Sequence, residues 1–160
     1  MSPSSNGQLA RELFEEVYNT GNLDRLAEFF SPEIKMNAYW YSPTDPPSTD
    51  GQPQQDDQPE VSVFEQMKQG ITWWKQNYQE TRDEIDQIIE ADDQVVVLET
   101  IKIKYLDGTP ADIKSIHIFR FENGKIIEDT WLWDRLGNWQ QIGIVPPTSQ
   151  LDAQLKERLS

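Results

Sequence analysis

Three ionisable side chains occupy three consecutive predicted strands. Glu99 lies in a strand predicted over 94–105, His117 in one over 111–121 and Asp129 in one over 125–133. Side chains alternate between the two faces of a strand, and each of the three shares its face with mostly apolar neighbours. A histidine between carboxylates has its charged form favoured and can act as a general acid or base. Because the chain has 1 histidine, this is the natural candidate for proton transfer.

The turns between these strands decide whether the three side chains meet. A three-residue loop in the second hairpin would place His117 opposite Asp129, and the first hairpin would then place Glu99 opposite His117. A two-residue Asn-Gly turn is the alternative, and it would put Thr130 opposite His117. We therefore expect a catalytic row Glu99–His117–Asp129, in which His117 and Asp129 move protons and Glu99 orients the imidazole. The competing interpretation is a satisfied polar histidine within a sheet.

Aromatic and amide side chains near this row are candidates for substrate binding. They come from the first predicted strand, the third predicted helix and the last two strands: Tyr39, Asn37, Trp74, Trp131 and Phe119. Rings of this kind suit a flat apolar ligand, and core packing is the alternative role for most of them. No metal site is predicted, because one histidine and no cysteine leave only carboxylates without calcium-loop spacing.

Hydrophobic periodicity supplies the elements that must position these residues. Apolar residues at helical spacing predict a helix from Gln8, a short helix after Asn22 and a third helix that Ser62 caps ahead of 64–78. Strands are predicted at 34–41, 81–91, 94–105, 111–121 and 125–133, and a peripheral helix at 148–160. Residues 42–60 are rich in Pro, Asp, Gln and Ser and are predicted to form an acidic loop inserted in the domain.

This order of elements predicts one α+β domain over residues 1–160. Helices gathered in the N-terminal half, followed by strands with short turns, are typical of helices packed on one face of a curved antiparallel sheet. A sheet that wraps around helices leaves a concave pocket between the two layers.

The overall charge argues against several classes of partner. With 28 acidic and 14 basic residues the net charge is -14, which repels nucleic acid and anionic membrane surfaces. No apolar run reaches the roughly 20 residues of a membrane span. The absence of cysteine fits a cytoplasmic protein.

Two segments resemble the SnoaL-like polyketide cyclases of the nuclear transport factor 2-like superfamily. They are LFEEVYNTGNLDRLAEFFSPEI near the start and HIFRFENGKIIEDTWLWDRLGNWQQIG near the end. The likeness spans most of residues 8–143 and is weak over the inserted loop. It implies a cone of three helices on a curved, mostly antiparallel sheet around a pocket, commonly as a homodimer.

The same resemblance implies an activity. Members of the family close a polyketide ring by an intramolecular aldol reaction, using an Asp as acid and base and a nearby His, with no cofactor. His117 matches such a histidine, whereas the family's Asp falls at Trp131, and Asp129 on the same face is its candidate replacement. We therefore expect a cofactor-independent cyclase or isomerase acting on an apolar or polycyclic small molecule.

Other activities of the superfamily stay open. Ketosteroid isomerases carry a Tyr and an Asp where this chain has Phe14 and Ala38, and the Arg-x-Asp pair of limonene-type epoxide hydrolases is missing. The alternatives are a non-catalytic ligand-binding or dimerisation module, and an epoxide hydrolase or cyclase of another layout.

Overall fold

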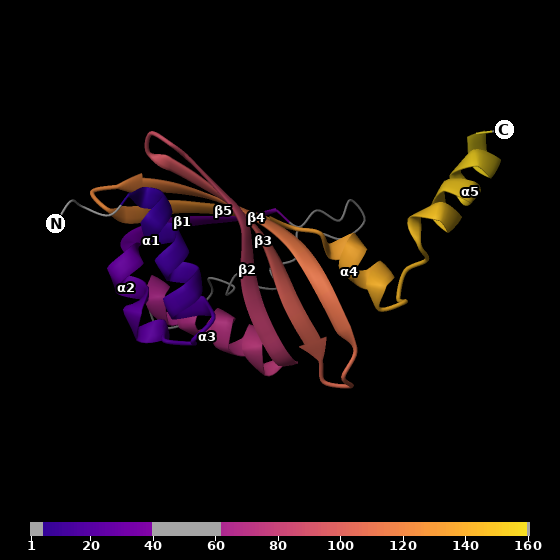
Figure 1. Ribbon diagram of the computed structural model, residues 1–160, viewed down its shortest axis with the longest axis horizontal. Helices are drawn as coiled ribbons and strands as arrows, with labels where there is room; N and C mark the ends of the chain where they lie inside the picture. Colours follow the sequence, from indigo (N-terminus) through magenta and orange to yellow (C-terminus); the bar gives the residue numbers. More distant parts are fainter. Residues whose placement is uncertain (1–4, 40–61, 160) are drawn as a thin grey trace, which may run out of the picture.

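The computed structural model describes residues 5–39 and 62–159 as helices around one bent sheet (Figure 1). The helical elements are α1 (Asn6–Glu12), the π-helix η1 (Leu13–Tyr18), the 3₁₀ turn η2 (Leu23–Arg25), α2 (Leu26–Phe29), α3 (Val63–Gln76), α4 (Arg135–Gln141) and α5 (Thr148–Leu159). The strands are β1 (Phe30–Tyr39), β2 (Tyr78–Ala91), β3 (Gln94–Tyr105), β4 (Pro110–Glu122) and β5 (Lys125–Trp133). The predicted loop at 42–60 lies outside the described residues.

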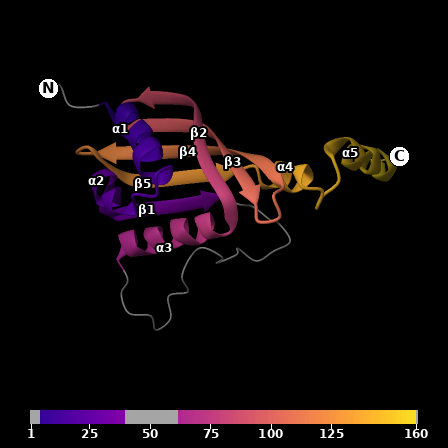
Figure 2. The same cartoon turned by 60° about the horizontal axis from the view of Figure 1, so that its bottom comes forward.

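The five strands form a single sheet in the order β1-β5-β4-β3-β2. β1 runs parallel to β5, and the other neighbours are antiparallel. α1, α2 and α3 lie on the same side of this sheet in both ribbon views, while α5 extends away from it (Figures 1 and 2). The predicted α+β class, with helices of the N-terminal half on one face of a curved sheet, is confirmed.

Two apolar clusters fill the space on the helical side, which we call the inner face of the sheet. The larger cluster joins the first helices to one end of the strands, with Phe14, Val17, Val97 and Phe119 among its buried members. The smaller cluster lies at the other end and is built on Ile101, Ile103, Ala111 and Ile113, with Trp74, Tyr78, Tyr105, Trp133 and Ile142 packed against it. Burial of apolar area of this kind is the main stabilising contribution to the fold.

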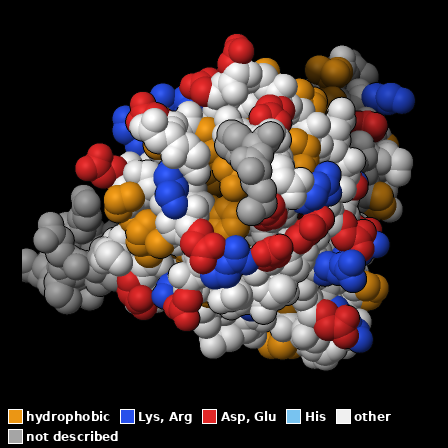
Figure 3. All heavy atoms as spheres, turned by 60° about the vertical axis from the view of Figure 1, so that its left-hand side comes forward, with side chains coloured by type: hydrophobic (Ala, Val, Ile, Leu, Met, Phe, Trp, Pro, Cys, Tyr) orange, Lys and Arg blue, Asp and Glu red, His pale blue; other side chains and the backbone are white. Residues whose placement is uncertain are grey.

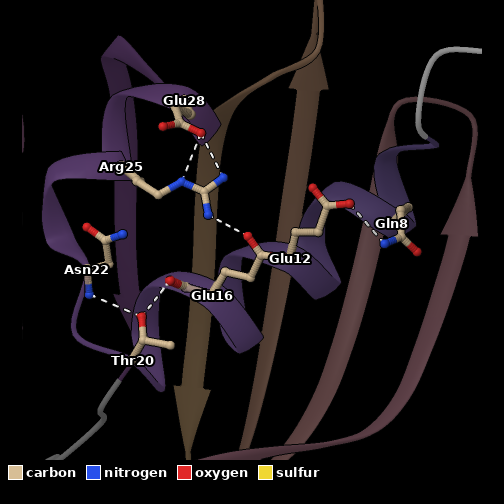
Figure 4. A network of polar contacts seen from close by, with 7 residues as sticks. All are labelled: Gln8, Glu12, Glu16, Thr20, Asn22, Arg25 and Glu28. Carbon is tan, nitrogen blue, oxygen red and sulfur yellow. Dashed lines mark hydrogen bonds and ion pairs between the residues drawn. The ribbon is translucent and has the colours of Figure 1, made fainter. Parts of the chain in front are cut away.

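Exposed polar contacts tie the first helices together (Figure 4). Arg25 forms ion pairs with Glu16 of η1 and with Glu28 of α2. The Thr20 hydroxyl donates to the Glu16 carbonyl at 2.6 Å, and the helix ends at Gly21 with a φ of 74°. The charged surface around these helices mixes both signs, with Asp and Glu side chains interspersed among Lys and Arg (Figure 3).

Several boundaries differ from the sequence prediction. β1 begins at Phe30 and so includes the Pro32 segment expected to separate helix from strand, and β2 begins at Tyr78. Helix α4 was not predicted; it begins after Asp134, whose carboxylate accepts a hydrogen bond from the Gly137 amide at 2.8 Å. Asn22 makes no side-chain cap, whereas Ser62 caps α3 as expected by accepting from the Glu65 amide.

Candidate functional site

The predicted row of ionisable side chains comes together on the inner face. His117 Nδ1 lies 3.0 Å from Asp129 Oδ1, and His117 Nε2 lies 3.3 Å from Glu99 Oε1. Glu99 and Asp129 are only 1% and 2% exposed, and the imidazole side chain is 12% exposed. With a carboxylate at each ring nitrogen, the imidazole has acceptors for both N–H groups of its protonated form.

The contacts are diagonal and not directly cross-strand, so both predicted registers are wrong. His117 is opposite Trp131 on β5 and opposite Val97 on β3. The second hairpin turns through two residues, with positive φ at Asn123 and Gly124. A bulge between this turn and Asp129 then shifts the pairing by one further residue. The total offset of two residues from the expected register keeps Asp129 on the inner face, where it still reaches His117.

Polar residues form a belt across the inner face between the two apolar clusters. Along β4, Ile113 belongs to one cluster, Ser115 and His117 follow, and Phe119 belongs to the other cluster. We define the polar belt by its members on four neighbouring strands: Asp83, Glu99, Ser115, His117 and Asp129. Burying such groups costs free energy unless they are paired, so the belt is either structurally satisfied or kept for a function.

Aromatic rings enclose the histidine at the centre of the belt. Phe119 stacks on it with ring centres 5.3 Å apart, Trp131 stacks at 6.2 Å, and Phe14 of η1 meets it edge-on at 5.5 Å. Two of the predicted substrate-binding residues, Phe119 and Trp131, therefore contact the imidazole. Phe119 is fully buried, so only Trp131 of the two has surface available to a ligand.

The carboxylates determine the charge of the imidazole. Burial acts to lower the pKa of His117, but the charges and hydrogen bonds of Asp129 and Glu99 outweigh it and raise the pKa to about 10. At neutral pH the ring is therefore a buried cation held between two acids. Both of its ring nitrogens face carboxylates, and it is too weak an acid to release its proton readily at that pH.

Asp83 and Tyr18 are members of the site that sequence reasoning missed. Burial, and next the negative charge of Glu99, raise the pKa of Asp83 to about 7. Burial, followed by the charges of Asp129, Asp83 and Glu99, raises the pKa of Tyr18 well above its usual value, so its hydroxyl stays protonated. The sequence feature that could have placed Asp83 on the inner face is the spacing of Ile85 and Ile88. Both pack on the core although they are three residues apart, whereas residues on one face of a regular strand are two apart. That spacing requires a bulge, and with it Asp83 falls on the inner face.

Two buried oxygens of the belt have no hydrogen-bond partner among the described residues. They are Oε2 of Glu99 and Oγ of Ser115, which face each other across the β3–β4 pair. Unpartnered buried oxygens are costly, and native proteins usually satisfy them with protein, water or ligand. These two oxygens are therefore the unsatisfied polar positions of the belt.

The remaining predicted binding residues lie elsewhere. Asn37 donates hydrogen bonds to Glu128 and Thr130 on the opposite, outer face of the sheet. Trp74 packs on Tyr78 and Trp133 in the smaller apolar cluster, with ring centres 4.5 Å and 4.7 Å away. Tyr39 pairs with Leu132 at the end of β1, and its side chain lies outside the described part.

An open groove lies beside the belt, between η1 and β2. It has a volume of about 450 Å³ and is lined by Glu15, Asn19, Thr81 and Arg82. Within residues 5–39 and 62–159, no group of three or more acidic or histidine side chains has the geometry of a metal site. No helix in those same ranges is long and apolar enough to cross a membrane.

Comparisons with known proteins agree with this architecture. A model of the SnoaL-like domain matches residues 10–129. Among solved structures, IdmH of Streptomyces antibioticus, described as a proposed polyketide cyclase, is 15% identical, with 88% of this chain and 99% of that chain covered and a TM-score of 0.68. AclR of Streptomyces galilaeus, described as a proposed hydroxylase, is 18% identical over 96% of this chain and 92% of that one, also with a TM-score of 0.68.

A third similar structure carries no assigned activity. It is a nuclear transport factor 2-like protein of unknown function from Burkholderia pseudomallei, 22% identical over 88% of this chain and 99% of that chain, with a TM-score of 0.65. The chain has no match among curated protein sequences. At these identities the structural likeness establishes the fold.

Proposed function

Because the chain belongs to the SnoaL-like domain family, we propose that it binds an apolar or polycyclic, polyketide-like molecule at the polar belt and rearranges it by acid–base chemistry without a cofactor. The observation that carries this proposal is the buried imidazole cation between Asp129 and Glu99, flanked by aromatic rings. The description of IdmH as a proposed polyketide cyclase supports the substrate class.

In this proposal three residues of the belt have physical roles. His117 provides positive charge where negative charge develops on the substrate oxygen during enolate formation. Asp129 holds the ring protonated through Nδ1, and Glu99 orients it through Nε2. Trp131, beside the ring, supplies apolar contact area for a flat substrate.

The lone histidine provides a direct test. We expect 2-tetralone, a neutral bicyclic ketone, to shift the imidazole NMR resonances of His117, because binding at the belt changes the ring's surroundings. Trp131→Ala should weaken that effect, whereas Trp73→Ala should leave it unchanged, because Trp73 is 65% exposed on α3 and apart from the belt. Unchanged His117 resonances at saturating ketone would refute binding at this site.

A non-catalytic binding module is the alternative that one observation favours. Both ring nitrogens of His117 are already occupied by carboxylates, as expected for a structural ion pair. Such a module would bind 2-tetralone and shift the histidine signal, but it would not exchange the protons next to the ketone carbonyl with solvent deuterium. The exchange rate therefore separates the enzyme from the module.

The outer face of the sheet supports a second proposal, that the protein forms a homodimer. Apolar side chains from β2, β4 and β5 are exposed there: Ile89, Ile116, Ile118 and Leu132, at 38% to 50%. Ile116 is opposite Leu132, so the residues form a contiguous outer apolar patch. Paired charges border the patch, among them Arg120 with Glu128. At this face such pairs reduce the electrostatic repulsion between two copies that each carry a net charge of -14.

A further inference from the structure

Asp83 differs from the other acids of the belt because no described side chain pairs with its carboxylate. Glu99 and Asp129 each contact the His117 ring, whereas the hydrogen bonds of Asp83 to other residues involve only its backbone. The Asn19 amide donates to the Asp83 carbonyl at 2.8 Å, and Asn19 Oδ1 accepts from the Asp83 amide at 2.8 Å. The strand is thus fixed at this residue, while the carboxyl group has no side-chain partner among the described residues.

The sheet register places this free carboxyl group at the edge of the belt. Asp83 is opposite Ile101 and Ile85 is opposite Glu99, so Asp83 and Glu99 are diagonal neighbours on the inner face. Diagonal neighbours in an antiparallel pair have Cα atoms about 7–8 Å apart, within reach of long side chains. The charged or titratable groups that act on Asp83 come from three elements: Glu99 of β3, Lys75 of α3 and His117 of β4, while Asp83 acts in turn on Tyr18 of η1.

We propose that Asp83 is the residue that takes and returns the proton in the reaction proposed above, on a substrate whose C–H bond is acidified by a neighbouring carbonyl group. This inference rests on the proposed function and extends it to a residue outside the predicted row. The three predicted acid–base residues are already paired with one another, and Asp83 is the acid of the belt that is left to react.

The electrostatics of the belt support this division of roles. A general base works best when its pKa lies near the working pH, and burial together with the charge of Glu99 raises the pKa of Asp83 to about 7. The pKa of His117, raised to about 10, keeps the ring cationic at the same pH. Environments that separate the pKa values of neighbouring groups commonly define the base and the charge-stabilising partner of a site.

The proposed step balances without a co-reactant. The Asp83 carboxylate removes a proton from the carbon next to the carbonyl, and the C–H electron pair moves onto the carbonyl oxygen to give an enolate. The protonated Tyr18 hydroxyl and the His117 cation are the nearby groups that can stabilise the oxygen's negative charge. The enolate carbon then attacks a second carbonyl of the same molecule, and Asp83 returns the proton to the new alkoxide. The net change is an isomerisation.

The open groove lies next to the backbone of Asp83. Asn19, which holds the Asp83 backbone, lines the groove together with Thr81, the neighbour two residues before Asp83 on the same strand. Residues two apart on a strand share a face, so Thr81 and Asp83 both project to the inner side. A substrate approaching between η1 and β2 would therefore reach the side of the sheet on which Asp83 lies.

Two measurements test the inference on the intact protein. The first follows solvent exchange of the α-protons of 2-tetralone in D₂O by proton NMR. We expect the wild-type rate to rise through a midpoint near pH 7, and Asp83→Asn to lower the rate at least about 10²-fold and to remove that midpoint. Asp112→Asn, an exposed acid on β4, is the matched control and should exchange at the wild-type rate.

The second measurement titrates the Asp83 carboxyl group in protein labelled with ¹³C at the aspartate side chain, assigned by the signal missing in Asp83→Asn. A midpoint near pH 7 supports the inference, and a midpoint below about pH 5 overturns it. Exchange that survives in Asp83→Asn but is lost in Asp129→Asn overturns the role of Asp83 and leaves the proposed function standing. Wild-type protein that neither exchanges 2-tetralone protons nor responds to the ketone at His117 overturns the proposed function and this inference together.

Discussion

At the scale of single residues, the ion pairs of the belt link chemistry to stability. His117 is enclosed by two acids that are almost completely buried. A buried cation of this kind offsets the desolvation free energy of its two carboxylate partners. Removing the cation leaves two buried negative charges without a positive partner. The residue types of this row could be predicted from alternation along the strands. Asp83 was missed, because its inward position becomes evident only when the spacing of Ile85 and Ile88 is interpreted as a bulge.

The first residue-scale prediction concerns the loss of the cation. Replacing His117 with Gln should lower the free energy of unfolding at pH 7 by about 3–5 kcal/mol, because Glu99 and Asp129 would stay buried without their positive partner. Urea unfolding measures this change. The triple variant His117→Gln, Glu99→Gln, Asp129→Asn removes all three charges and should recover part of the loss. A triple variant less stable than the single one would contradict the electrostatic explanation.

The second residue-scale prediction is a stability that falls over two intervals as the pH rises. The pKa of Asp83 is raised from its usual 3.8 to about 7, so the folded protein binds more protons than the unfolded chain between those values, and stability decreases across them. For His117 the pKa is raised from 6.5 to about 10, and its stabilising contribution is complete below 6.5 and lost as the pH passes 10.

Unfolding by urea at pH 5, 7 and 9 separates the two intervals. Asp83→Asn should reduce the decrease between pH 5 and 7, and His117→Gln should reduce the one between pH 7 and 9. The charge of Glu99 raises the pKa of Asp83, whereas Lys75 and His117 lower it, and the paired surface acids with lowered pKa values, such as Asp24 and Asp86, titrate below this range. The same slope in Asp83→Asn as in the wild type would mean that Asp83 is not the titrating group.

At the scale of elements, local capping and periodicity predict more than register does. Ser62 and the apolar spacing after it located α3. The π-helix η1 is invisible to periodicity, because its Asn19 amide donates to the Phe14 carbonyl, five residues back, within an otherwise helical pattern. The register of the β4–β5 hairpin depended on a two-residue turn and on a bulge. Each shifts the pairing by one residue, so together they leave Asp129 on the inner face.

The element-scale prediction tests the link between η1 and β2. Asn19→Ala removes both hydrogen bonds to the Asp83 backbone and leaves a partly buried amide and carbonyl unpaired, at a cost of about 1–3 kcal/mol in unfolding free energy. Amide hydrogen exchange at Asp83 should accelerate as well. Asn22→Ala is the control, since the Asn22 side chain is exposed and makes no cap bond. Equal stability of the two variants would show that the link does not hold β2 in place.

At the scale of the whole molecule, the two faces of one sheet carry different kinds of side chains. Its inner face carries the polar belt between the two apolar clusters, and its outer face carries the apolar patch around Ile118. Side-chain alternation lets neighbouring residues of β4 serve both faces: His117 points inward and Ile118 outward. A partner bound to the outer face would therefore stiffen the strand that holds the imidazole.

The last prediction tests the homodimer on this outer face. Ile118→Lys places a charge at the centre of the patch, opposite Thr130 and beside Val96, where burial against a second copy would leave it unpaired. Sedimentation analysis should give a dimer for the wild type and a monomer for the variant. Leu106→Lys, in the exposed turn between β3 and β4, should stay dimeric. Because His117 is the next residue, its NMR signal should also shift when the dimer dissociates. A wild-type protein that remains monomeric at high concentration would instead leave the outer patch exposed in solution and refute the dimer.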